Sequence, residues 1–597
     1  MSDFIFNRQP VQYGSLSNII SSIYSVAPPK IFEYHGKWGS LAVSQNVYTG
    51  FDPYETKHHI LVIIGGPVLS FCDNSSLTSS DHNAGTKAIY ERWISSNQIK
   101  WDMDLLGPFT ALFIDKTNGE LTVVTDIMSF IPVFASSFDE KLIISTHIDM
   151  AAKAAEKEAD WDIISVADFI LSGVVTYPYT CYSNFRQIAP AAVHKWQSCR
   201  CEAKSQSYWI PTEKKGYSTI AEAGAAVQTS LKEYVGKVTK NMKKVGLFIS
   251  GGEDSRVVLG ILPKDISKDG FIFLEGMNRE GKISRKAAKI YGAKLNMYAR
   301  ESTHYLDILP ECSDIIGSGS QYGHIHAYLF HKLCGLNSYS AVFGGFLSDT
   351  FLKGHKIAKI GACYRFPFLP EIKQRKDHYC DPVSNNFLYD DILEKISARR
   401  RHHYDYIKQL RPNSADEWVG LWPMSMQGDI PHINGHRHLF RSYEPFTSPA
   451  IVKIAACVPQ SWKLNRRLFR IAAKPFLKPS KWLVHTDGRL PYFQWYFNLP
   501  LQFIRKVCNK FRKVFHPYTI PQYAWYDEEK LLASKKAKEL ESQYNMQLEY
   551  LSRILVKNKN DKLINLLTNP VQKRNLLQVA YILYKNQTCE RTILEKV

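Results

Sequence analysis

The sequence predicts a protein of mixed α/β and α+β class, with an antiparallel β sandwich and its helices first and a parallel-sheet domain with a helical C-terminal extension after it. Three observations predict this fold. Short runs rich in β-branched and aromatic residues fill the first 200 residues, strand, glycine-rich turn and helix patterns then alternate, and helical patterns prevail from residue 365 onward. We expect domains at 1–212, 213–490 and 491–597.

Composition sets the outer limits of the interpretation. The chain has 597 residues, of which 45% are hydrophobic and 22% charged, so collagen-like, disordered and low-complexity classes are excluded. Eleven cysteines are scattered without a C-x-x-C pair, which favours thiols in a reducing compartment over a zinc ribbon or a disulfide framework. The first residues lack a secretory pattern, and the apolar run Ile60–Leu69 is too short for a bilayer. We therefore expect a cytoplasmic protein.

The first half reads as a series of short strands. The turn Asp115–Glu120 separates two of them as a hairpin. A polar stretch with a proline then precedes a helical pattern over Thr219–Lys240, which places the domain boundary near 210–218. The expected strands cover 38–48, 59–64, 109–115, 121–125 and 142–145.

The second half changes to strand, turn and helix. Val245–Ile249 is a continuous apolar run, Gly270–Leu274 is a second strand, and Ile283–Tyr291 reads as a helix, which is typical of a parallel α/β domain. Between them the segment Ser250–Ser255, with the sequence SGGEDS, joins a strand to a helix. Its glycines permit a tight turn, and its amide and hydroxyl donors at a helix N-terminus suit pyrophosphate.

An aspartate in such a loop calls for a cation. Asp254 would repel phosphate unless Mg²⁺ lies between them, because Mg²⁺ takes one or two carboxylates together with phosphate oxygens. The alternative interpretation is a plain turn with a capping serine. The loop has neither the Walker pattern nor the dinucleotide-binding pattern of glycines.

The loop SGGEDS resembles the signature loop of ATP pyrophosphatases of the asparagine synthetase family. A second glycine loop, Phe343–Asp349 (FGGFLSD), resembles the family's loop that ends in a magnesium-binding aspartate. The first domain is similar to the family's class II glutaminase domain over Gly107–Phe134, which implies a sandwich like that of the Ntn hydrolases. The resemblance implies ATP and Mg²⁺ as cofactors. It implies ATP contacts at Leu247, Ser250, Gly251, Gly252, Asp254, Ser255, Leu274 and Gly345, and metal binding at Asp254 and Asp349.

Two departures from the family bear on the reaction. Glutamine-hydrolysing members carry a catalytic cysteine at residue 2, where this chain has Ser2, and their Asn-Gly element falls near Ile64 and Gly65. We therefore expect a degenerate glutaminase site, as in the β-lactam synthetases and lasso-peptide cyclases. Phe346 stands where asparagine synthetases have Glu and β-lactam synthetases have Tyr, and phenylalanine cannot relay a proton.

The general base on the amine side is therefore open. By residue type the candidates are His324, His326, His331, His355, Tyr443 and Glu444, with the first three on one expected helix. The family's pyrophosphate-stabilising cations fall near Lys478, Lys481 and Arg489, of which Lys481 and Arg489 are weak catalytic candidates, and Arg256 could lie close to phosphate. Plain surface charge is the competing interpretation for each cation.

The resemblance implies an ATP-dependent ligase that adenylates a substrate carboxylate and transfers the acyl group to an amine without glutamine hydrolysis. The substrates would be small molecules or peptides. Three alternatives stay open: a lasso-type peptide macrocyclase, a glutamine-dependent asparagine synthetase, and a nucleotide-binding protein that has lost catalysis. The sequence names neither the carboxylate nor the amine, and it leaves the oligomeric state open.

A basic segment near the C-terminus stands apart from these motifs. The chain carries a net charge of +19, and Phe497–Phe515 alternates basic residues with apolar ones and contains no acid. Such a helix could meet a membrane surface, a nucleic acid or an acidic peptide. The competing interpretation, which we favour from the sequence, is that its apolar side packs on the body of the protein.

Overall fold

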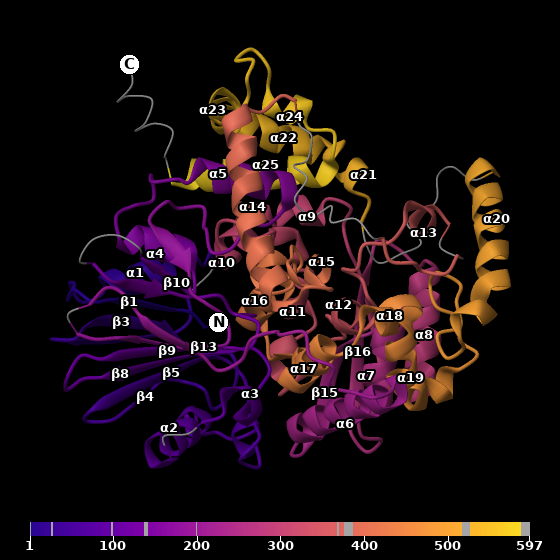
Figure 1. The fold of residues 1–597 in the computed structure, drawn as a ribbon, viewed down its shortest axis with the longest axis horizontal. Helices are drawn as coiled ribbons and strands as arrows, with labels where there is room; N and C mark the ends of the chain where they lie inside the picture. The colour runs from indigo at the N-terminus through magenta and orange to yellow at the C-terminus, as the bar shows by residue number, and fades with distance from the viewer. Residues whose placement is uncertain are drawn as a thin grey trace.

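The computed structural model describes residues 2–25, 28–96, 99–136, 141–198, 200–366, 369–374, 386–515 and 526–586. Within these ranges the side chains of residues 96, 365, 506, 509, 510 and 512–515 are not described. Figure 1 shows the β-rich first half on one side and the helix-rich second half on the other.

The first half contains two six-stranded antiparallel sheets. One has the order β12-β10-β11-β1-β3-β2 and the other β14-β13-β9-β8-β5-β4. Alternate residues such as Phe4, Phe6 and Val62 are buried in one apolar cluster with residues of both sheets, so the layers form a sandwich. The strands of the first sheet are β1 (Phe4–Asn7), β2 (Ile31–Gly36), β3 (Gly39–Ser44), β10 (Phe134–Ser136), β11 (Ile143–Ser145) and β12 (Phe185–Gln187). Those of the second are β4 (Tyr54–Glu55), β5 (His59–Gly65), β8 (Phe109–Asp115), β9 (Leu121–Thr125), β13 (Ala192–Trp196) and β14 (Lys204–Ser207).

The local expectations for this half are confirmed. The predicted hairpin pairs Ile114 with Leu121, and the apolar run after residue 59 forms β5, a turn and a short strand. That short strand, β6 (Val68–Leu69), pairs with β7 (Leu105–Leu106). The helices of this half are α1 (Ser15–Ser21), α2 (Ala84–Ser96), α3 (Trp101–Asp104), α4 (Ile148–Ala154) and α5 (Ile163–Ser172).

The second half is built on a parallel five-stranded sheet with the order β17-β16-β15-β18-β19. Its strands are β15 (Lys244–Phe248), β16 (Ser267–Leu274), β17 (Lys294–Ala299), β18 (Val342–Phe343) and β19 (Ser442–Tyr443). Three longer helices, α6 (Ile220–Thr239), α7 (Glu253–Ile261) and α8 (Arg279–Tyr291), alternate with the first strands. Because β15 and β18 are neighbours, the two loops that follow them meet at one edge of the sheet.

The described residues from 369 onward are mostly helical, as predicted. The segment 527–545 contains two helices, α21 (Glu528–Leu532) and α22 (Lys535–Gln543), because the Ser534 side chain accepts a hydrogen bond from the Ala537 N–H and starts a new helix. Longer helices are α14 (Asp390–Leu410), α16 (Pro431–Leu439), α17 (Pro449–Cys457), α19 (Arg467–Leu477), α20 (Leu499–Phe515), α23 (Asn545–Leu555) and α25 (Pro570–Lys585). Short ones are α9 (His304–Asp307), α10 (Leu309–Ile316), α11 (Phe330–Leu333), α12 (Ser348–Leu352), α13 (Gly361–Arg365), α15 (Ala415–Trp418), α18 (Gln460–Lys463) and α24 (Leu563–Leu566).

The last helices close over both halves. In α25, Gln572 donates to the Leu171 carbonyl and Asn575 to the Phe169 carbonyl, both in α5 (Figure 1). Residues of α21 to α25 also share one apolar cluster with α5 and α10. None of the described helices is long and apolar enough to cross a bilayer.

The expectation that α20 packs its apolar side on the body is wrong. Phe503, Ile504 and Phe511 are 55%, 57% and 62% exposed. Figure 1 shows α20 at the edge of the molecule.

Candidate functional site

The two glycine loops predicted from the sequence lie against each other. The first joins β15 to α7 and the second joins β18 to α12. A Cβ atom on Gly345 would lie 2.8 Å from the Cβ of Asp254 and 3.1 Å from its carbonyl carbon. Only glycine allows this approach, so Gly345 lets the second loop contact the first at the aspartate.

A buried lysine joins the acidic residues of the two loops. The Nζ atom of Lys353 lies 2.5 Å from Asp254 Oδ1, 3.1 Å from Asp349 Oδ1 and 3.2 Å from Glu253 Oε1. The Lys353 side chain is 2% exposed, and Ser348 Oγ also donates to Asp254 Oδ1 at 2.5 Å. The two aspartates predicted to bind a metal are thus held on a single positive charge.

The oxygen donors of this arrangement are of the kind that Mg²⁺ binds. Two carboxylates from two loops, one of them half-exposed, are a donor set that Mg²⁺ takes together with phosphate oxygens. Burial raises the pKa of Asp254 to about 6, Lys353 opposes the rise, and Asp349 adds to it. The carboxylates therefore fit a cation in charge and in type. No group of three or more His, Cys, Asp or Glu side chains among the described residues forms a metal site by itself.

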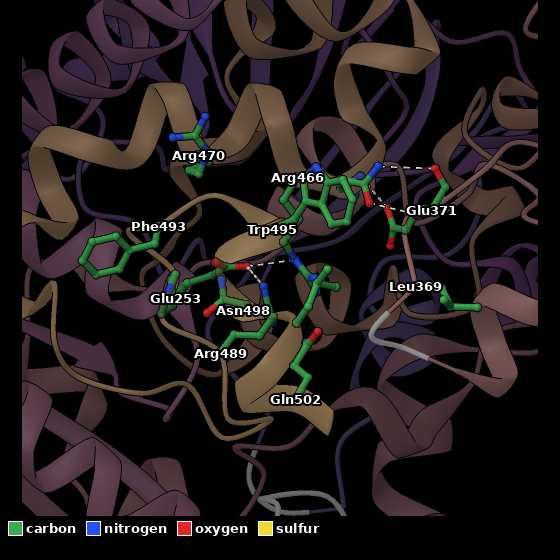
Figure 2. A pocket seen from close by; sticks show the side chains of 13 residues that line it. Glu253, Leu369, Glu371, Arg466, Arg470, Arg489, Phe493, Trp495, Asn498 and Gln502 are labelled. Atoms are coloured by element: carbon green, nitrogen blue, oxygen red, sulfur yellow. Dashed lines mark hydrogen bonds and ion pairs between the residues drawn. The ribbon is translucent and has the colours of Figure 1, made fainter. Parts of the chain in front are cut away.

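A cavity with three arginines in its lining opens beside Glu253. It has a volume of about 60 Å³, and Arg466, Arg470 and Arg489 line it together with Glu253 (Figure 2). Glu253 Oε1 lies 3.0 Å from Arg466 Nε and 3.6 Å from an Arg489 Nη atom. Burial would raise the pKa of Glu253, but Lys353, Arg489 and Arg466 outweigh it and hold that pKa well below its usual range.

The Arg489 guanidinium has a buried N–H donor without a partner among the described residues. Arg489 donates from Nε to Asp487 Oδ2 at 2.6 Å, whereas its buried Nη2 atom has no hydrogen-bond partner among the described residues. A buried N–H group without a partner is costly, and an anion in the cavity would satisfy it. The predicted candidate Arg489 therefore lies in the site.

The first loop is braced from within and from outside. Ser255 Oγ donates to the Ser250 carbonyl at 3.1 Å, and the Gly251 N–H donates to Glu280 Oε1 at 2.6 Å. Arg256 is buried and donates to the carbonyls of Gly251, Leu483 and Val484. Burial lowers the pKa of Arg256 to about 10. Arg256 thus fixes the loop in place, and its guanidinium is occupied by backbone carbonyls.

Other predicted residues lie elsewhere. Leu247 and Leu274 are buried in β15 and β16. Lys481 lies on the exposed surface with its Nζ 5.6 Å from the ring centroid of Trp482, and Lys478 is exposed as well. Lys481 is therefore not brought together with the carboxylates.

The candidates for the amine side are split among several elements. His324 ends a short 3-10 helix and His331 lies in α11, so the single helix expected for His324, His326 and His331 is not present. Burial lowers the pKa of His324 and of His331 to about 4, so both are neutral. His355 is exposed just after α12, and Tyr443 is buried in β19.

Glu444 is the candidate that reaches the second loop. It is 3% exposed, and its Oε2 accepts a hydrogen bond of 2.8 Å from the Phe346 N–H. Its Oε1 lies 3.3 Å from Nε2 of His432, whose ring stacks on Phe346 with centroids 4.5 Å apart. A carboxylate and an imidazole therefore flank the residue that replaces the family's Glu or Tyr.

Sequence reasoning missed Lys353, Arg466, Glu253 and His432. Lys353 follows Asp349 by one helical turn, which is a signal that the sequence does contain. Arg466 and His432 come from segments far along the chain, and only the folded structure brings them to the loops.

The position expected for the glutaminase nucleophile is sealed. Ser2 is fully buried, and its carbonyl accepts from Arg437 of α16. Asp3 Oδ1 accepts from Arg437 Nη2 at 2.7 Å, and Asp3 Oδ2 lies 2.6 Å from His438 Nε2. A small cavity of about 10 Å³ is lined by Arg437 and Glu444 among others, and Ser2 is not part of its lining.

Comparisons with known proteins give little beyond this geometry. No family model and no curated protein matches the chain. Among solved structures, it is similar to an allosteric regulatory enzyme of purine biosynthesis, with 8% identity and a TM-score of 0.25, over 50% of this chain and 80% of that one. It is also similar to glutamine phosphoribosylpyrophosphate amidotransferase from B. subtilis complexed with ADP and GMP, with 8% identity and a TM-score of 0.23, over 50% of this chain and 65% of that one. With TM-scores this low, neither likeness adds to what the sheets and their strand orders show of the fold.

Proposed function

We propose that this protein is an ATP-dependent ligase that activates a carboxylate and joins it to an amine. The observation that carries the proposal is the contact between the two glycine loops. Through Gly345 that contact brings Asp254 and Asp349 onto one shared cation beside a cavity lined by guanidinium groups. Paired carboxylates next to buried cations suit a nucleotide triphosphate with its metal ion better than they suit an uncharged ligand.

In the proposed reaction, a carboxylate oxygen of the substrate displaces pyrophosphate from the α-phosphorus of ATP, and an amine then displaces AMP from the acyl carbon. Asp254 and Asp349 would hold Mg²⁺, which when bound neutralises charge on the phosphate oxygens. Arg489 would donate its spare Nη2–H to the departing pyrophosphate, and Arg466 would add positive charge on the same side.

Glu444 and His432 supply the acid–base group that Phe346 cannot. The attacking amine must lose a proton, and a carboxylate held against the second loop can accept it. His432 lies within reach of the same carboxylate and orients it. Phe346 would then serve as an apolar wall stacked on His432.

The amine would come from a source other than glutamine hydrolysis. Ser2 is fully buried, and Arg437 and His438 occupy both carboxylate oxygens of the next residue, Asp3. A glutamine side chain would need to reach Ser2 Oγ through this packing. The sealed site favours free ammonia or an amine-bearing second substrate, and peptide cyclisation is the special case in which both groups belong to one chain.

The test is release of pyrophosphate and AMP from Mg-ATP by the full chain. Glutamine, ammonia, aspartate and a cell-extract fraction are supplied in turn. In the Asp254→Asn and Asp349→Asn variants we expect release to fall at least about 100-fold. Asp391→Asn is the matched control, because that side chain is 64% exposed on α14. Equal release by Asp254→Asn and the wild type would overturn the proposal.

A second function, nucleotide binding without turnover, is favoured by one observation. Lys353 supplies a built-in positive charge to Asp254, Asp349 and Glu253, so part of the negative charge of the acidic cluster is balanced without a metal ion. Tight ATP binding that persists when Mg²⁺ is chelated, with no pyrophosphate released under any condition, would support this function over the ligase.

A further inference from the structure

The orientation of α20 is the reverse of what an amphipathic helix on a folded body adopts. Its polar side faces the protein, since Gln502 lines the cavity of Figure 2 and Arg505 packs beside Gly488. Its apolar side faces outward, with Ile504 57% exposed and Phe511 62% exposed. The helix therefore presents its hydrophobic surface to whatever lies outside the molecule.

The sequence of α20 divides between two sides, with one exception. At 3.6 residues per turn, its apolar residues other than Leu499 occupy one half of the helix circumference and its basic residues the other, and Leu499 lies on the basic half and lines the cavity. Residues 499–515 contain no Asp or Glu. The basic residues are Arg505, Lys506, Lys510, Arg512 and Lys513, and the apolar ones are Leu499, Pro500, Leu501, Phe503, Ile504, Val507, Cys508, Phe511, Val514 and Phe515.

Basic positions border the apolar half along both of its edges. On the helix circumference, positions 506 and 510 adjoin Phe503, and positions 505 and 512 adjoin Leu501 and Cys508. A helix that lies in the plane of a membrane has this distribution, because its apolar half enters the acyl chains and its flanking cations reach the headgroups.

Exposed aromatic side chains extend the surface beyond the start of α20. Trp482 is 68% exposed, Tyr496 52% and Phe497 62%. Trp482 and Phe497 are linked through Phe493, whose ring centroid lies 5.0 Å from that of Trp482 and 5.5 Å from that of Phe497. Aromatic rings of this kind favour the boundary between water and lipid.

We propose that α20 and the aromatic group Trp482, Tyr496 and Phe497 dock this protein on an anionic lipid surface. Charge decides between the possible partners. A nucleic acid or an acidic peptide would bind the basic half of the helix, but part of that half, at Gln502 and Arg505, packs against the protein. The exposed face of α20 is apolar, its borders are basic positions of the sequence, and the helix lies at the edge of the molecule (Figure 1). An anionic bilayer matches both its apolar centre and its charged borders.

The experiment is co-sedimentation of the full chain with two kinds of vesicle, one of phosphatidylcholine alone and one of phosphatidylcholine and phosphatidylglycerol in equal amounts. We expect binding to the anionic vesicles that weakens as salt is added. The double variant Ile504→Gln/Phe511→Gln should lose at least about tenfold in binding, because both side chains would leave the lipid. The matched control is Tyr13→Gln, which replaces a side chain 78% exposed in the first half.

A second double variant tests the contribution of the basic positions of α20 to vesicle binding. Lys506→Glu/Lys510→Glu should lose binding to anionic vesicles, whereas Lys535→Glu, at a side chain 93% exposed on α22, should keep it. Thermal melting of each variant shows whether it is folded. Failure of the wild type to bind anionic vesicles would overturn the proposal, as would equal binding by Ile504→Gln/Phe511→Gln. Light scattering that shows a dimer dissolved by the same double variant would assign the face to a second copy of the chain instead.

Discussion

Two acidic clusters, one at Asp3 and one at Asp254, use the same kinds of partner but differ in access from solvent. Asp3 is fully buried, and Arg437 and His438 occupy both of its oxygens. In the second cluster the Asp254 side chain is 22% exposed and the Asp349 side chain 53% exposed. Charges that are fully matched inside the protein hold structure together, whereas charges that keep access to solvent are available to a ligand.

The two clusters also differ in the charged side chains that surround them. Around Asp254, three carboxylates face Lys353, Arg466 and Arg489, and Arg470 lines the adjoining cavity as well. The lining of that cavity contains three arginines, Arg466, Arg470 and Arg489, and two carboxylates, Glu253 and Glu371, and this local excess of one positive charge suits an anion that arrives from outside. At Asp3 the same chemistry joins the sandwich to α16 of the second half, as a structural contact.

The largest expected effect concerns the sealed cluster. Asp3→Asn leaves the Arg437 guanidinium buried without its counter-charge, and we expect it to reduce the free energy of unfolding by about 3–5 kcal/mol. Chemical denaturation measures this change. Asp73→Asn serves as the control, because it alters an aspartate outside the packed interface. A loss no larger than that of the control would show that the Asp3 cluster does not stabilise the fold.

The next prediction uses the pH dependence of the same cluster. Burial lowers the pKa of His438 to about 4, Arg437 acts in the same direction and Asp3 opposes it. Between pH 6.5 and pH 4 the unfolded chain takes up a proton at this histidine while the folded protein does not. The free energy of unfolding should therefore decrease as the pH is lowered from 6.5 to 4, by about 3 kcal/mol from this residue.

Other buried histidines contribute to the same decline, so the difference between two proteins is the quantity to measure. Melting of His438→Gln should show a shallower loss of stability from pH 6.5 to pH 4 than the wild type. His402→Gln, at an exposed position on α14, should follow the wild type. Parallel curves for His438→Gln and the wild type would contradict the assignment.

Much of this architecture could be predicted because its signals are local. The hairpin at Asp115–Glu120 and the loop Ser250–Ser255 are each specified by a few adjacent residues, and both are found where the sequence places them. The second glycine loop, identified by resemblance, follows β18, and its Gly345 makes a close approach to Asp254.

The rest depended on contacts between distant segments. Nothing near Lys353 in the sequence shows that Glu253 and Asp254 will surround it, since they lie about a hundred residues away. The periodicity of α20 defines its apolar half, but it does not say whether that half is covered, and the expectation that it packs inward was wrong. Local pattern predicts elements, and only tertiary packing decides what they face.

The next prediction is that pyrophosphate release depends on the Asp254 cluster and does not depend on the Asp3 cluster. Arg489→Lys keeps a positive charge beside Glu253 and Asp487 but removes the forked Nη2 donor, and we expect pyrophosphate release to fall about 100-fold. Ser2→Ala, in the sealed region, should leave release within about twofold of the wild type. Melting curves check that both variants are folded. A strong loss of release in Ser2→Ala would show that the sealed region takes part in the reaction.

The smallest expected effect tests the contact between the two loops. Gly345→Ala places a methyl group 2.8 Å from the Asp254 Cβ and 3.1 Å from its carbonyl carbon, so the second loop must move away by a few tenths of an ångström. Asp349 would then shift relative to Asp254, and we expect pyrophosphate release to drop about tenfold, since misplacement of groups that position a substrate slows the reaction. Gly236→Ala in α6 is the control, because a Cβ there meets nothing within 4 Å and alanine favours the helix. If Gly345→Ala releases pyrophosphate at the wild-type rate, the approach of the two loops is not needed for catalysis, and the paired aspartates act independently of it.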